Sequence, residues 1–166
     1  KPFRRHSLLR LMALRQEPAS PVSIQTQRSV PLLQGHSQLR VLLAEDNPVN
    51  ALLASTLLRR EGYIVTQASN GEEVLKALAD GIRPDLIIMD VEMPVLDGLE
   101  TTRCIRRKEA ERGAAGVPIL ALTANVQRQD IDACLEAGMD GYLSKPFDRD
   151  ALHEVIARLI KRQVVA

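Results

Sequence analysis

Short runs of apolar residues alternate regularly with segments of helical spacing from residue 39 onward. The runs predict strands at residues 39–45, 63–68, 85–90, 117–123 and 141–144, and the continuous apolar stretches at 39–45 and 85–90 indicate that those two strands are buried. Between and after them, apolar residues recur every three or four positions, which predicts helices over residues 48–61, from Asn70 to Gly81, and over 99–111, 125–137 and 145–162. Strands that alternate with helices at this spacing form βαβ units with right-handed crossovers. The sequence therefore predicts an α/β fold with a doubly wound, five-stranded parallel sheet.

The helix predicted over residues 48–61 carries two stripes of largely apolar residues. We predict that one stripe packs on the sheet; it consists of Val49, Leu52, Leu53, Thr56 and Leu57. We predict that the other stripe, of small and apolar residues, faces away from the core; it consists of Ala51, Ala54, Ser55 and Leu58. Pro48 suits the first helical position, and Asp46 and Asn47 precede it as candidate caps.

The first 38 residues differ from the rest of the chain in charge and composition. They carry a net charge of +5 and four of the nine prolines, whereas the remaining residues carry a net charge of −4. Residues 1–16 align without a gap on residues 145–160, with six identities. We interpret them as the last helix of a preceding domain of the same kind, with a chance similarity between two amphipathic helices as the alternative. The remaining segments are interpreted as a linker (17–38), the domain (39–162) and a tail (163–166), and a first residue other than Met suggests a fragment of a longer protein.

Composition excludes several classes of function. Aromatic residues make up only 2% of the chain and Trp is absent, which argues against a base-stacking platform for nucleic acid. No apolar run approaches the ~20 residues that span a bilayer, so we expect no membrane contact by this fragment. No Gly-rich loop follows the first predicted strand, which excludes a nucleotide-binding fold. Cys104 and Cys134 lack metal-ligand spacing and are interpreted as free thiols.

Five side chains suited to phosphate chemistry stand at the ends of predicted strands: Glu45, Asp46, Asp90, Thr123 and Lys145. In an open parallel sheet, ligands bind beyond the carboxyl ends of the strands, where the strand order reverses. If the order is 2-1-3-4-5, the three carboxylates converge there, and an all-oxygen set of this kind favours Mg²⁺. Mg²⁺ beside an ammonium suits phosphoryl transfer to an Asp nucleophile. Each residue alone would more often be a helix cap, a turn former or a solvated charge, so the joint pattern carries the hypothesis.

Four sequence motifs carry a resemblance to a known family. "LLAEDNPVN", "IIMDVEMPVLDG", "ILALTA" and "GYLSKPF" occur in this order and resemble the signatures of receiver domains of two-component signalling. The resemblance covers about residues 39–162 and implies the flavodoxin-like fold of that family, with strand order 2-1-3-4-5.

The resemblance also implies roles for individual residues. Asp90 would accept a phosphoryl group from a phosphohistidine, Lys145 would pair with that group, and Thr123 would hydrogen-bond it. The resemblance implies four Mg²⁺ ligands, namely Glu45, Asp46, Asp90 and the backbone carbonyl of Glu92. Thr123 would then move toward the phosphoryl group and Tyr142 would swing inward as a switch. Glu92 and Asn125 occupy positions where the family tunes the lifetime of the phosphoryl group.

The form of the first motif, "EDNPVN", resembles receivers of hybrid sensor histidine kinases more than those of transcription factors. The fragment would catalyse its own phosphorylation and dephosphorylation. Its parent protein would be a hybrid kinase. This domain would lie in the cytoplasm even if the parent protein is anchored in a membrane. Its partners would be a kinase phosphohistidine domain or a histidine phosphotransfer domain. We expect the phosphotransfer partner to dock on Ala51, Ala54, Ser55, Leu58 and Pro146.

Two alternatives differ in function. One is a receiver that no longer takes phosphate and serves only as an interaction module. The other is an Mg²⁺-dependent phosphatase of the haloacid dehalogenase type, which also uses an Asp nucleophile on a parallel sheet. That family needs Asp-x-Asp after its first strand, whereas here the candidate nucleophile follows the third strand and Glu92 stands where the second Asp should be.

Overall fold

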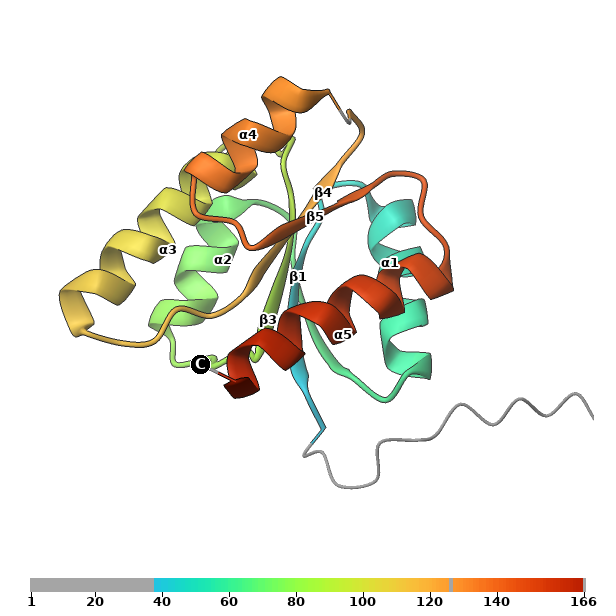
Figure 1. Cartoon of the computed structure of the whole chain (residues 1–166), viewed down its shortest axis with the longest axis horizontal. Helices are drawn as coiled ribbons and strands as arrows, with labels where there is room; N and C mark the ends of the chain where they lie inside the picture. Colours follow the sequence, from blue (N-terminus) through green and yellow to red (C-terminus); the bar gives the residue numbers. More distant parts are fainter. Residues whose placement is uncertain (1–37, 126, 166) are drawn as a thin grey trace, which may run out of the picture. The chain divides into compact units, whose positions relative to one another are not determined.

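Five parallel strands form one sheet in the order β2-β1-β3-β4-β5 (Figure 1). The structure is a computed structural model that describes residues 38–125 and 127–165. The strands are β1 (Arg40–Ala44), β2 (Ile64–Ala68), β3 (Leu86–Asp90), β4 (Ile119–Thr123) and β5 (Gly141–Ser144). Both the strand order and the parallel direction confirm the predicted topology. The interpretation of residues 1–16 and of almost all of the linker falls on residues outside the described part.

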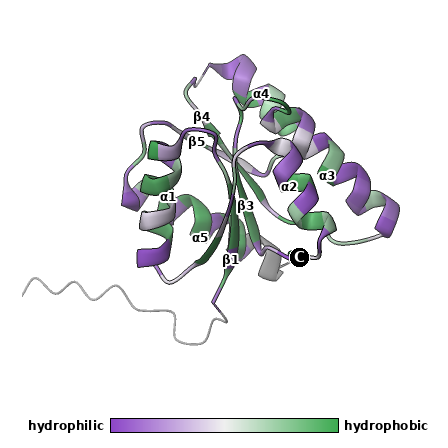
Figure 2. Cartoon of the chain, turned by 180° about the vertical axis from the view of Figure 1, so that it is seen from behind, coloured by the Kyte–Doolittle hydropathy of each residue, from purple (hydrophilic) through white to green (hydrophobic). Residues whose placement is uncertain are grey.

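Two layers of helices cover the two faces of the sheet (Figure 1). The helices are α1 (Pro48–Arg60), α2 (Gly71–Ala79), α3 (Gly98–Arg112), α4 (Arg128–Glu136) and α5 (Arg149–Val165). α1 and α5 contribute buried residues to one core, and α2, α3 and α4 contribute to the other. Successive residues of a strand enter opposite cores, as Leu42 and Leu43 of β1 do, because side chains alternate across a pleated strand. The hydrophobic strands therefore lie between the layers (Figure 2), which explains the continuous apolar stretches at 39–45 and 85–90.

Local side-chain caps begin most of the helices. Asn47 accepts hydrogen bonds from the backbone of α1, and Asn70 and Asp97 do the same for α2 and α3. α4 begins at Arg128, three residues later than predicted, and its first turn has no side-chain cap. α5 begins at Arg149 rather than residue 145, because the preceding residues form a loop that contains the cis Lys145–Pro146 bond.

The predicted faces of α1 are wrong for most of the residues that define them. Ala54, Ser55 and Leu58 were expected to face away from the core, and Ser55 and Leu58 are in fact fully buried. Three of the five side chains expected to pack on the sheet are instead exposed, namely Val49 by 72%, Leu52 by 66% and Leu53 by 53%. Leu57 packs against the core as expected. The small Ala54 and Ser55 allow α1 to approach the sheet closely, so the small-residue stripe is the packing face. Ala54, Ser55 and Leu58 are therefore unavailable to a partner as docking residues, whereas Ala51 is only partly buried and Pro146 is exposed.

Candidate functional site

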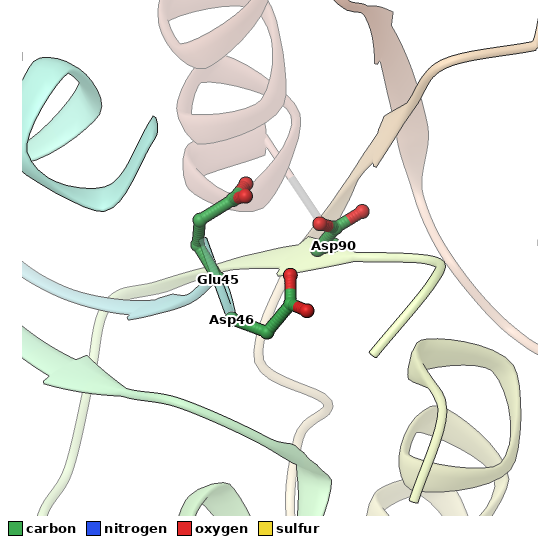
Figure 3. Close-up of side chains that lie close together, drawn as sticks. All are labelled: Glu45, Asp46 and Asp90. Atoms are coloured by element: carbon green, nitrogen blue, oxygen red, sulfur yellow. The ribbon is translucent and has the colours of Figure 1, made fainter. Parts of the chain in front are cut away.

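The carboxylates expected at the strand ends lie together at one edge of the sheet. Glu45 and Asp46 directly follow β1, and Asp90 is the last residue of the neighbouring strand β3. One oxygen from each of the three carboxylates lies within 4.8 Å of the others (Figure 3). Glu45 and Asp90 are buried, whereas Asp46 is exposed. The sheet topology thus brings together the acidic residues that the sequence places apart.

Lys145 supplies the positive charge beside these carboxylates. Its Nζ lies 2.6 Å from Asp90 Oδ2 and 2.6 Å from Glu45 Oε2. The backbone amide of Lys145 donates to the Thr123 carbonyl at 2.8 Å, which extends the pairing of β5 with β4 and fixes where the side chain starts. One ammonium therefore bridges two buried carboxylates.

Burial and neighbouring charges set the protonation of the cluster. Burial raises the pKa of Asp90, and the nearby Glu45 carboxylate raises it further, whereas the hydrogen bond from Lys145 opposes both effects. The Glu92 amide also donates to Asp90 Oδ1 at 3.3 Å and favours the carboxylate form. Burial alone would lower the pKa of Lys145, but its hydrogen bonds to Asp90 and Glu45 raise it overall. Lys145 therefore stays an ammonium.

The donor set fits a hard divalent cation. Three carboxylates face a single ammonium, which leaves an excess of negative charge at the cluster. The ligands on offer are all oxygen atoms, and the exposed side of Asp46 leaves room for coordinated water. Mg²⁺ prefers oxygen ligands and keeps several of its waters, so it suits this arrangement.

The predicted switch residues occupy opposite environments. The Thr123 hydroxyl is buried; it donates to the Asn125 carbonyl at 2.8 Å and accepts from the Asn125 amide at 3.1 Å. The Tyr142 side chain is 41% exposed. The structure thus places Thr123 at the end of β4 near the cluster, with its hydroxyl engaged by the following loop and Tyr142 outward.

The loop that follows Asp90 packs tightly onto the strand end. A Cβ on Gly98 would lie 2.2 Å from the Asp90 carbonyl oxygen, so only glycine permits this approach. Gly98 also donates to the Val91 carbonyl at 3.0 Å. Gly98 therefore packs directly against the backbone that carries Asp90.

Two features of the site were missed by sequence reasoning. Asn50, in the first turn of α1, donates through Nδ2 to Glu45 Oε1 at 2.9 Å. The signal was its position five residues after Glu45, where the first turn of the next helix passes over the strand end. The second feature is a hollow of about 250 Å³ between α1 and the β5–α5 loop, lined by Asn50, Leu53, Lys145, Pro146 and Phe147.

The family model of the response regulator receiver domain matches residues 41–157. This chain belongs to the receiver domain family. Among curated proteins, the sensor histidine kinase GacS of Pseudomonas protegens is 42% identical over 120 residues, which cover 72% of this chain and 13% of GacS. GacS and two other curated relatives, from Dictyostelium discoideum and Oryza sativa, are much longer than this chain, which spans only 7–13% of their lengths.

Solved structures agree with the receiver fold. The receiver domain of sensor histidine kinase PA1611 from Pseudomonas aeruginosa, with a magnesium ion coordinated in its active-site cleft, is 44% identical. The match covers 75% of this chain and 99% of that domain, with a TM-score of 0.67. One chain in a co-crystal structure of the Saccharomyces cerevisiae histidine phosphotransfer protein Ypd1 with the receiver domain of Ssk1 is 32% identical in sequence to this chain. That match has a TM-score of 0.72 and covers 78% of this chain and 94% of the matched chain.

Membership of the receiver family leaves the phosphatase alternative without support. None of the helices within the described residues is long and apolar enough to cross a membrane.

Proposed function

We propose that this receiver domain accepts a phosphoryl group on Asp90 within a phosphorelay. The contact of the Lys145 ammonium with both Asp90 and Glu45 is the observation that supports the proposal most directly. In the reaction, an Asp90 carboxylate oxygen attacks the phosphorus of a phosphohistidine and forms a P–O bond. The P–N bond breaks, and the histidine nitrogen leaves with its electron pair. Lys145 is placed to pair with the negative oxygens of the transferred group.

Mg²⁺ is the metal that we propose for this site. Glu45, Asp46, Asp90 and the Glu92 carbonyl would hold it, and the bound ion would neutralise charge on phosphoryl oxygens. The magnesium ion in the PA1611 receiver domain supports this choice.

The phosphoryl group would also act as a switch. It adds about −1.5 to −2 charges and strong hydrogen-bond acceptors beside Thr123. We expect the Thr123 hydroxyl to leave Asn125 and donate to the phosphoryl group, and Tyr142 to move inward from its exposed position. The population of the switched state is set by the better contacts of the phosphoryl group in that state.

Intact mass spectrometry with acetyl phosphate and Mg²⁺ tests phosphorylation. The parent protein should gain the mass of one phosphoryl group, and the adduct should be lost in base, as for an acyl phosphate. Asp90→Asn should gain none, whereas the matched variant Asp132→Asn, at an exposed carboxylate of α4, should be labelled like the parent. An unlabelled parent would favour the alternative of a phosphorylation-incompetent interaction module, whereas equal labelling of Asp90→Asn would refute Asp90 as the acceptor.

The exposed face of α1 is the docking surface that we propose for a histidine phosphotransfer domain. Val49, Leu52 and Leu53 form an apolar patch beside the hollow, and the hollow extends to Lys145. A helix of the partner packed on this patch would bring its phosphohistidine to Asp90. The Ypd1–Ssk1 receiver complex supports a partner of this class. The parent protein that we propose is a hybrid sensor histidine kinase, as the names of the relatives suggest.

Leu53→Asp tests this surface. Leu135 of α4 provides a matched control, because it is 51% exposed against 53% for Leu53 but lies in the opposite helix layer. With phosphorylated Ypd1 as the probe, Leu53→Asp should slow transfer and Leu135→Asp should not, while both keep the parent's labelling by acetyl phosphate. Equal transfer rates for the two variants would refute docking on α1.

A further inference from the structure

A carboxamide on α1 contacts the acidic cluster from the side of the docking surface. Asn50 Nδ2 donates to Glu45 Oε1 at 2.9 Å, and the other oxygen of Glu45 lies 2.6 Å from Lys145 Nζ. The Glu45 side chain is only 1% exposed, so bulk water has little access to replace either partner. Each oxygen of Glu45 thus has its own nitrogen partner, and the carboxylate links Asn50 to Lys145.

The backbone at Asn50 is itself held in place. Asn47 Oδ1 accepts from the Val49 amide at 2.9 Å and from the Asn50 amide at 3.4 Å, which caps the first turn of α1. The side chain of Asn50 therefore starts from a fixed point and has only a short reach to Glu45.

The chemistry of the carboxamide suits this position. It donates a hydrogen bond without adding a charge to a cluster in which three carboxylates share one ammonium. A lysine or arginine in its place would bind Glu45 as a second cation and compete with Lys145. An alanine would leave Glu45 Oε1 buried without this donor, which is costly for an ionised group.

We propose that Asn50 is a positioning residue for phosphoryl transfer, because it orients Glu45 so that Glu45 holds the Lys145 ammonium against Asp90. The inference rests on the proposed function of Asp90. Without the Asn50 donor, both oxygens of Glu45 turn to the Lys145 ammonium and draw it away from Asp90. Asn50 also lines the hollow beside Leu53, so the same side chain links the docking surface to the cluster.

The variants that test this role are Asn50→Ala and Asn50→Asp, with Thr56→Ala as the matched control. Thr56 lies on the same helix, and its hydroxyl donates to the Leu52 carbonyl at 2.7 Å, so its loss also removes one hydrogen bond but away from the cluster. Loss of a residue that orients a metal-binding carboxylate typically costs about 10-fold or more in activity or metal affinity. We expect Asn50→Ala to lower the acetyl phosphate labelling rate about 10-fold at saturating Mg²⁺. Asn50→Asp should lower it further because it adds a carboxylate beside Glu45.

The side-chain ¹H–¹⁵N NMR signal of the Lys145 ammonium, recorded without Mg²⁺, gives a readout independent of activity. It should shift or broaden in both Asn50 variants and stay unchanged in Thr56→Ala. The inference would be overturned if Asn50→Ala kept both the NMR signal of the Lys145 ammonium and the labelling rate of the parent protein. This holds even if the variant unfolded at a lower temperature, because Asn50 would then have only a structural role. Failure of the proposed function looks different, because the parent protein itself would then remain unlabelled.

Discussion

Lys145 is expected to hold the acidic cluster together before any ligand binds. Its Nζ contacts the Glu45 and Asp90 carboxylates at 2.6 Å each, and their side chains are only 1% and 7% exposed. Lys145→Met keeps an unbranched apolar stem but removes the ammonium, so two buried carboxylates remain close together with reduced compensation. The variant should therefore be less stable than the parent at neutral pH.

The size of the loss follows from the burial of the three side chains. Removing one partner of a buried ion pair costs about 3–5 kcal/mol. We expect the lower end, about 3 kcal/mol, because the Lys145 side chain is 19% exposed and Asp46 is open to solvent. In a domain of this size, such a loss corresponds to a drop of roughly 10 °C in the midpoint of thermal unfolding.

The loss should depend on pH in a defined direction. Burial already raises the pKa of Asp90, and removal of Lys145, which opposes that effect, raises it further. A carboxyl group whose pKa is higher in the folded state binds its proton more tightly there. Its ionisation therefore destabilises the fold as pH rises through the window between the unfolded and folded pKa values. The deficit of Lys145→Met should consequently shrink as pH falls from neutral toward about 3.9, the ordinary value for Asp.

Urea and thermal unfolding of four proteins would measure the effect: the parent, Lys145→Met, Asp90→Asn and the double variant. Lys145→Met should cost less in the Asp90→Asn background, because one of the two carboxylates is already neutral. Lys108→Met, at an exposed lysine of α3, controls for the loss of a surface charge. The reasoning is refuted if Lys145→Met unfolds with the parent, or if its cost is the same with and without Asp90→Asn.

Four further substitutions test other parts of the structure by unfolding midpoints. Leu58→Ala should lower the free energy of unfolding by about 2–5 kcal/mol, because Leu58 is fully buried. Leu52→Ala, on the exposed face, should change it by less than about 0.5 kcal/mol. A larger loss for Leu52→Ala than for Leu58→Ala would restore the predicted rotation of α1. Val95→Gly should stabilise the domain by about 1 kcal/mol, because Val95 has a φ of 70° and its side chain is 73% exposed; a lower midpoint would contradict backbone strain there. Arg106→Ala should cost about 2–3 kcal/mol, since the guanidinium bonds Glu109, Asp140 and the carbonyls of Val117 and Gly138, and a neutral result would show that these bonds add nothing net.

The sheet and the acidic cluster could be predicted because their signals are local in the sequence. β3 and β4 are buried along their whole length and are therefore largely continuous apolar runs, as in Leu86–Asp90. Parallel strands end at one edge of the sheet, so Asp46 and Asp90 meet there once the strand order is known. Helix starts were less accurate where no side chain caps the first turn, as at Arg128.

The rotation of α1 could not be predicted because both of its stripes are apolar enough to be buried. Hydrophobic spacing alone favours the larger residues such as Leu52 and Leu53, but two facts outside that pattern decide the matter. Asn50 must face Glu45, and residues 54 and 58 follow it at intervals of one turn, so they share its side of the helix. The large apolar side chains are thereby left on the surface, and Leu53 lines the hollow that also contains Lys145, which is where a partner that delivers a phosphoryl group would need an apolar contact. The rotation of α1 thus accounts both for the error in the packing prediction and for the location of the proposed docking surface, because it buries the small-residue stripe and leaves Val49, Leu52 and Leu53 exposed.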